Sequence, residues 1–177
     1  MRIIQKTWYL FMVLSLCFSQ GVLPLTQRYF HTEDMGYDYS RGTYLIVLAD
    51  ASLESILRDE STGDFVHFKQ TQGFDVQLIT FGEGGGTPDY LRDYLQGYIE
   101  NTDSMLEYVL LIGDINGSYA IPPFTISSYN ESEMDVTDYP YTFFKNEKIL
   151  EPEFYIGRWS IRSQEDLKKI KMRSIQY

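Results

Sequence analysis

The residues that most clearly indicate a functional site are a glycine and an aspartate that follow an uninterrupted apolar run. Residues 108–112 read Tyr-Val-Leu-Leu-Ile, and Gly113 and Asp114 come directly after them. An apolar run of this kind predicts a strand that is buried on both faces. Open α/β sheets bind ligands at the carboxyl ends of their strands, so Asp114 is predicted to lie where such a sheet places its functional groups.

A second candidate is the glycine-rich stretch at residues 81–88, Phe-Gly-Glu-Gly-Gly-Gly-Thr-Pro, which precedes a helical pattern. A glycine loop ahead of a helix can hold phosphate on backbone N–H groups. This stretch lacks a Gly-Lys-Ser/Thr ending, and Thr87 stands where the third glycine of a Gly-x-Gly-x-x-Gly motif belongs. We therefore predict a connection that ends in a Thr87 cap with Pro88 at the first helical position, and no cofactor site.

The chain holds one cysteine, Cys17, and two histidines, His31 and His67. A cysteine peptidase needs a thiolate activated by a histidine. Cys17 lies in the apolar amino-terminal stretch, His31 in an irregular segment, and His67 beside Phe68 on a predicted helix surface. Neither a G-x-S-x-G elbow nor an H-E-x-x-H motif offers a substitute. The sequence therefore predicts no catalytic residue within the chain.

Residues 1–19 are predicted to be a secretory signal. Two basic residues precede an apolar run at 8–18, which is shorter than the about 20 residues that a membrane-spanning helix needs. Small residues at Cys17 and Ser19 place the expected cleavage before Gln20. A membrane anchor is the alternative, and Leu16 disfavours a lipoprotein attached through Cys17. The mature chain is then expected to be extracellular or on the cell surface, without cysteine and without stable membrane insertion.

The composition favours one packed domain and excludes one class of partner. Hydrophobic residues make up 44% of the 177 residues, which is enough for a core. The formal net charge is -10. Nucleic acid is excluded because binding its phosphates needs a surface rich in lysine and arginine. Cationic ions or basic partners match this charge better.

Hydrophobic periodicity predicts an α/β fold with a four-stranded, mainly parallel sheet flanked by helices in three layers. Residues 20–42 show no period and are expected to be a linker or irregular lead-in, and residues 115–142 are expected to form a long irregular loop. A helix with a break near Gly63 is expected between the first two strands. Further helices are expected to begin at Pro88 and after Ser163. The expected strands are residues 44–49, 74–80, 108–112 and 153–158.

Six segments occur in a recognisable order: residues 44–48, 65–69 with 73–76, 108–114 with Pro122, 138–139, 156–158 (Ile-Gly-Arg) and 163–167. Together they resemble the gingipain family of secreted cysteine endopeptidases, peptidase family C25. The resemblance implies a caspase-like, Rossmann-like half-domain over residues 43–177, the amino-terminal subdomain of a longer enzyme. In that family the general-base histidine, in a Gly-His-Gly setting, and the nucleophilic cysteine lie in a later half. We therefore expect a chain truncated at its carboxyl end, with the Cys/His dyad downstream.

The resemblance also implies a structural calcium ion. In the gingipains an aspartate at the end of the third strand, a glutamate shortly before the Ile-Gly-Arg segment and intervening carbonyls hold calcium, and Asp114 and Glu153 occupy the matching positions. A hard divalent cation takes several oxygen ligands. The intervening segment lacks an aspartate, and Glu147 is the candidate substitute. The alternative is that Asp114 caps a turn while Glu153 pairs with Arg158 or another cation.

The resemblance thus implies that the full-length parent cleaves protein or peptide substrates and that the missing catalytic subdomain is a partner of this chain. Two alternatives stay open. One is a secreted, non-enzymatic α/β binding or scaffold module that uses residues 115–142 as its binding surface. The other is a sortase-like gingipain relative that serves a bacterial secretion system.

Overall fold

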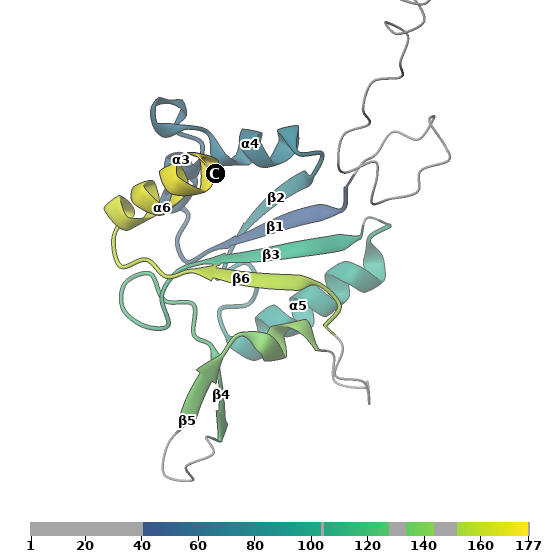
Figure 1. Ribbon diagram of the computed structural model, residues 1–177. Helices are drawn as coiled ribbons and strands as arrows, with labels where there is room; N and C mark the ends of the chain where they lie inside the picture. Colours follow the sequence, from purple (N-terminus) through teal and green to yellow (C-terminus); the bar gives the residue numbers. More distant parts are fainter. Residues whose placement is uncertain (1–40, 104, 128–133, 144–151, 177) are drawn as a thin grey trace, which may run out of the picture. The chain divides into compact units, whose positions relative to one another are not determined.

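The structure is a computed structural model that describes residues 41–103, 105–127, 134–143 and 152–176. The predicted signal at 1–19 and nearly all of the lead-in at 20–42 lie outside these residues. Figure 1 shows the elements, whose bounds are β1 (Thr43–Leu48), α3 (Ser52–Leu57), η1 (Glu60–Thr62), α4 (Phe65–Thr71), β2 (Asp75–Thr80), α5 (Pro88–Asn101), β3 (Leu106–Ile112), β4 (Phe124–Ser127), β5 (Met134–Thr137), η2 (Tyr139–Thr142), β6 (Tyr155–Trp159) and α6 (Gln164–Gln176).

The main sheet has four strands in the order β2-β1-β3-β6, and every neighbouring pair is parallel. β1 and β3 are central, and β6 forms one edge. Helices α3, α4 and α6 cover one face, while α5 covers the other (Figure 1). The predicted three-layer α/β fold with a parallel sheet is therefore confirmed.

Apart from Thr43 and Glu107, the two central strands consist of apolar and aromatic residues, because both of their faces are covered. In β1, Leu45 and Val47 pack with Leu91 and Leu95 of α5. The alternate residues of β1 and of β3 pack against α3, α4 and α6 on the opposite face. Strands buried in this way lose the polar and apolar alternation of a half-exposed strand, which is why the sequence shows continuous apolar runs.

Short polar side chains begin α5 and α6 at the predicted places. The Thr87 hydroxyl accepts a hydrogen bond from the backbone N–H of Tyr90 at 3.3 Å, and Pro88 occupies the first turn of α5. The break near Gly63 is also confirmed, because α3 ends at Leu57 and α4 begins at Phe65. Gly63 has a φ of 92°, a conformation that disfavours residues with a side chain.

The segment predicted to be one long irregular loop instead contains regular structure. β4 and β5 pair as an antiparallel hairpin that extends from the rest of the fold (Figure 1), and η2 follows. The short strands alternate polar and apolar residues, as in Phe124-Thr-Ile-Ser127, and such brief patterns are hard to separate from loop sequence.

Among the described residues, no helix is both long and apolar enough to span a membrane.

Candidate functional site

The carboxyl ends of β1, β3 and β6 meet at one edge of the sheet because the strands are parallel. β3 ends at Ile112, and the backbone N–H of Gly113 donates to the carbonyl of Trp159 at 3.0 Å. A Cβ at Gly113 would lie 2.8 Å from the carbonyl oxygen of Tyr119 and 3.0 Å from Cβ of Ala49. Only glycine permits this close approach, which brings the following loop back against the sheet.

Asp114 sits at this edge with 7% of its surface exposed. Its backbone N–H donates to the carbonyl of Tyr119, and its own carbonyl accepts from the N–H of Ile121, each at 2.8 Å. Side-chain Oδ2 accepts from Nε of Arg162 at 2.8 Å, and Oδ1 accepts from the N–H of Ile115 at 2.9 Å. Asp114 therefore closes the loop that follows β3, in agreement with the turn-capping alternative.

The bonds that Asp114 accepts stabilise its charged form. The Arg162 guanidinium and then the Ile115 N–H hold the pKa of the Asp114 carboxyl below its usual range. A carboxyl whose pKa is lower in the folded state stabilises the fold above its unfolded pKa, about 4, and loses this contribution as pH falls through the folded value.

We therefore expect Asp114→Asn to be less stable than the wild type at neutral pH, with a gap that narrows as pH falls below about 4. Urea unfolding of both proteins over an acid pH series measures this gap. Other carboxyls with lowered pKa titrate equally in both proteins and cancel in the comparison. A gap that does not change with pH would show that the Asp114 charge has no such role.

A second ion pair lies near the carboxyl ends of the strands. It joins Arg158 of β6 to Asp138, which immediately precedes η2. Nε and Nη2 of Arg158 donate to the two carboxylate oxygens at 2.8 and 2.6 Å. Nη1 donates to the carbonyls of Gly113 at 3.1 Å and Ile121 at 2.8 Å. The Arg158 side chain is only 10% exposed and that of Asp138 21%. Arg158 thus ties β6, the loop after β3 and the start of η2 together.

Sequence reasoning missed this pair. It weighed Glu153 as the partner of Arg158, whereas Asp138 fills both sides of the guanidinium fork. The available signal was an arginine at the end of a strand together with an aspartate in a segment expected to fold back on the sheet.

The structure does not bring Asp114 and Glu153 together. Asp114 follows the carboxyl end of β3, whereas Glu153 precedes the amino end of β6. Tyr108 pairs with Tyr155 and Ile112 with Trp159, so the paired part of the two strands is four residue steps long. These steps alone separate the backbone near Asp114 from the backbone near Glu153 by roughly 13 Å. The two carboxylates therefore do not fit one ion.

The described residues contain no cluster of three or more His, Cys, Asp or Glu side chains that could hold a metal ion. Asp114 binds Arg162 at the carboxyl ends of the strands, whereas Glu153 is exposed at their amino ends. Glu147 lies outside the described residues. Calcium binding by this chain stays a prediction.

The remaining sequence candidates lie apart from a catalytic arrangement. Within the glycine-rich loop, the Glu83 carboxylate accepts bonds from the N–H and hydroxyl of Thr80 at 2.6 and 2.9 Å, so the loop is held against the end of β2. His67 is exposed on α4, and its backbone N–H is capped by Asp64 at 2.8 Å. Cys17 and His31 lie outside the described residues.

The family model for peptidase family C25 matches residues 38–177. This chain belongs to that family. No curated protein matches the chain.

Two solved structures share the fold. One is the Arg-specific cysteine proteinase gingipain R, with a TM-score of 0.61 and 24% identity, covering 80% of this chain and 29% of that chain. The other is the complex of Porphyromonas gingivalis RgpB pro- and mature domains, with a TM-score of 0.58 and 26% identity, covering 76% of this chain. This C25 chain therefore spans 29% of the length of each of the two gingipain chains it matches.

Proposed function

We propose that this chain is the amino-terminal, non-catalytic scaffold of a secreted gingipain-like cysteine endopeptidase. The observation that carries the proposal is the C25 match over residues 38–177 in a chain whose one cysteine, Cys17, lies in the predicted signal. In the proposal, the Cys/His dyad that attacks the peptide bond belongs to a part of the parent that these residues do not include.

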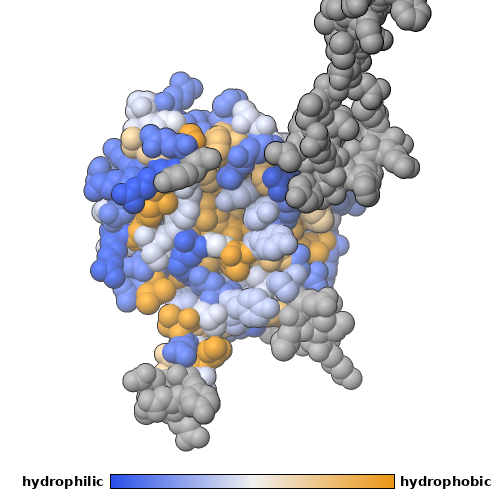
Figure 2. Space-filling view, in the orientation of Figure 1, coloured by the Kyte–Doolittle hydropathy of each residue, from blue (hydrophilic) through white to orange (hydrophobic). Residues whose placement is uncertain are grey.

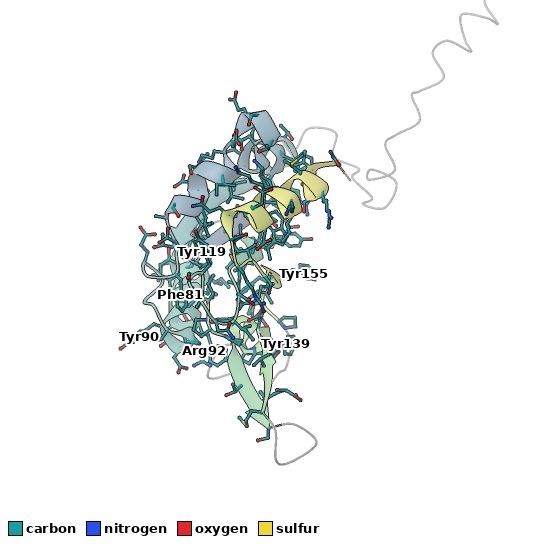
Figure 3. The ribbon with its side chains drawn as sticks, turned by 90° about the vertical axis from the view of Figure 1, so that its left-hand side faces the viewer. Phe81, Tyr90, Arg92, Tyr119, Tyr139 and Tyr155 are labelled. Atoms are coloured by element: carbon teal, nitrogen blue, oxygen red, sulfur yellow. The ribbon has the colours of Figure 1, made fainter. Side chains whose placement is uncertain are left out.

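The β6 edge of the sheet supports this scaffold role, because no other described strand pairs with β6 on its outer side. Tyr44, Tyr108 and Tyr155 lie side by side across β1, β3 and β6, with ring centroids 5.7 and 5.3 Å apart. This tyrosine row ends at Tyr155, which is 67% exposed at the edge strand (Figure 3). An aromatic row that reaches an open strand edge offers both main-chain and stacking contacts to a neighbouring domain. We propose that the catalytic subdomain of the parent contacts this edge.

Substrates and partners follow from the same proposal. Gingipain R is described as an Arg-specific proteinase, and RgpB forms a complex of pro- and mature domains. We assign protein or peptide substrates to the parent of this chain, and a protein domain as the partner of the scaffold. The substrate side chain next to the cleaved bond would be chosen by residues outside this chain.

Residues 20–177 are expected to show no peptidase activity, because they contain no cysteine that could supply the thiolate. Fluorogenic peptides with arginine or lysine before the reporter group measure turnover, with gingipain R as the positive control. Turnover by the purified chain that a thiol reagent abolishes would refute the scaffold role.

The calcium prediction needs its own test. Calorimetric titration of the wild type, Asp114→Ala and Glu153→Ala with CaCl₂ shows whether either carboxylate binds the ion. Loss of heat in one variant alone would assign the ion to that carboxylate. Heat unchanged by either substitution would exclude these carboxylates as ligands.

One observation favours the alternative of a non-enzymatic binding module. The β4–β5 hairpin exposes Ile126 (49%), Met134 (59%) and Val136 (53%) to solvent. Exposed apolar side chains on a protruding hairpin suit a protein contact. Figure 2 shows apolar residues on this extension. This surface is compatible with the scaffold proposal as well, since both require a protein partner.

A further inference from the structure

The loop that follows Asp114 has a narrow neck and an exposed tip. At the neck, the backbone N–H of Asp114 donates to Tyr119 and the backbone N–H of Ile121 donates to Asp114, each at 2.8 Å. Residues 115–118, Ile-Asn-Gly-Ser, form the tip and are all exposed. The tip therefore projects into solvent from a base that the sheet holds in place.

Gly117, which follows Asn116 at this tip, has open space where a side chain would stand. Gly117 has a φ of 87°, and a Cβ built on it would have nothing within 4 Å. Within the described part of the chain, the hydrogen bonds engage neither the Asn116 side-chain amide nor the backbone N–H of Gly117. The nitrogen of residue 117 thus carries no side chain beside it and no competing bond.

We propose that Asn116 is a site of spontaneous deamidation. The Gly117 backbone nitrogen, after loss of its proton to hydroxide, attacks Cγ of Asn116 and forms a new C–N bond. The Asn116 amide nitrogen leaves as ammonia, and the product is a five-membered succinimide. Water then opens either carbonyl of the ring and leaves aspartate or isoaspartate at position 116. The reaction adds water and releases ammonia, so it needs no oxidant, cofactor or second protein.

The arrangement favours the reaction through proximity. The attacking nitrogen and the carbon it attacks belong to adjacent residues, and glycine at the second position removes the steric shield that any side chain would place over the nitrogen. Exposure admits the hydroxide and water that the reaction consumes.

The modification would change the edge of the sheet that Asp114 closes. Each product adds a carboxylate two residues from Asp114, in a chain whose net charge is already -10. Isoaspartate also inserts Cβ of residue 116 into the backbone, which lengthens the loop. The asparagine of Asn116-Gly-Ser118, a glycosylation acceptor sequence, is lost as well.

The chain contains a matched internal control at Asn101. Its amide Nδ2 donates to the carbonyl of Gly97 at 2.7 Å, and the β-branched Thr102 follows it. Asn101 is also exposed, so solvent access alone does not distinguish the two asparagines.

Peptide mapping by mass spectrometry tests the proposal on the purified chain from a host without asparagine glycosylation. After incubation at alkaline pH, we expect the peptide that contains Asn116 to show aspartate and isoaspartate forms, and these forms should accumulate more slowly at mildly acidic pH. The Asn101 peptide should remain unmodified, and Asn116→Gln should abolish the signal. An unmodified Asn116 peptide would overturn the proposal, as would deamidation of Asn101 at an equal rate.

Discussion

Replacing Arg158 by alanine is expected to lower the free energy of unfolding by about 3 kcal/mol or more, because the change leaves a largely buried Asp138 carboxylate without its partner. It also removes the donor that satisfies the carbonyls of Gly113 and Ile121. β6, the loop after β3 and the start of η2 then lose the side chain that connects them. Urea denaturation followed by circular dichroism measures the effect.

Arg58→Ala is the control for this experiment. Arg58, the residue after α3, also donates to a carboxylate, that of Glu54, but both side chains of this pair are 46% exposed. Exposed pairs contribute little to stability, so this variant should stay close to the wild type. Arg158→Ala together with Asp138→Ala should cost less than the sum of the single changes. Equal effects of Arg158→Ala and Arg58→Ala would contradict the role given to Arg158.

The second large effect is expected at Lys171, a lysine of α6 with no exposed surface. Its ammonium donates to the carbonyls of Ile56 at 2.7 Å and Asp59 at 3.1 Å, and to the Thr62 hydroxyl at 2.7 Å. These acceptors lie where α3 ends and η1 forms, so Lys171 joins α6 to them. Lys171→Ala is expected to cost about 2–3 kcal/mol, because it removes charged hydrogen bonds and leaves buried and partly buried acceptors unpaired.

Two further variants separate the causes of this loss. Lys169→Ala changes an exposed lysine of the same helix and should leave stability nearly unchanged. Lys171→Met keeps most of the buried side-chain volume and removes the donors. If Lys171→Met matched the wild type, the buried hydrogen bonds would not contribute as described.

The sheet and its helix starts could be predicted from the sequence because their signals are local. The runs at 44–48 and 108–112 are apolar without alternation, which indicates strands covered on both faces. Thr87 with Pro88, and Ser163 with Asp166, mark helix starts through bonds that span three residues.

The contacts that shape the carboxyl edge could not be predicted in the same way, because they join residues far apart in sequence. Arg158 and Asp138 are 20 residues apart, Arg162 and Asp114 48, and Lys171 and Ile56 115. Which residues meet depends on strand order and register, and periodicity determines neither. The separation of Asp114 from Glu153 could have been predicted from the sequence. Asp114 follows its strand while Glu153 precedes its own, so parallel pairing of the two strands separates them.

We propose that the dyad that cleaves the peptide bond lies outside this chain, and covalent trapping tests this proposal most directly. An arginine-containing peptide with a thiol-reactive group should label gingipain R, whereas the purified chain and its Cys17→Ser variant should show no peptide-dependent adduct by intact mass. An adduct on the wild-type chain that is blocked by excess substrate peptide and lost in Cys17→Ser would contradict the scaffold role.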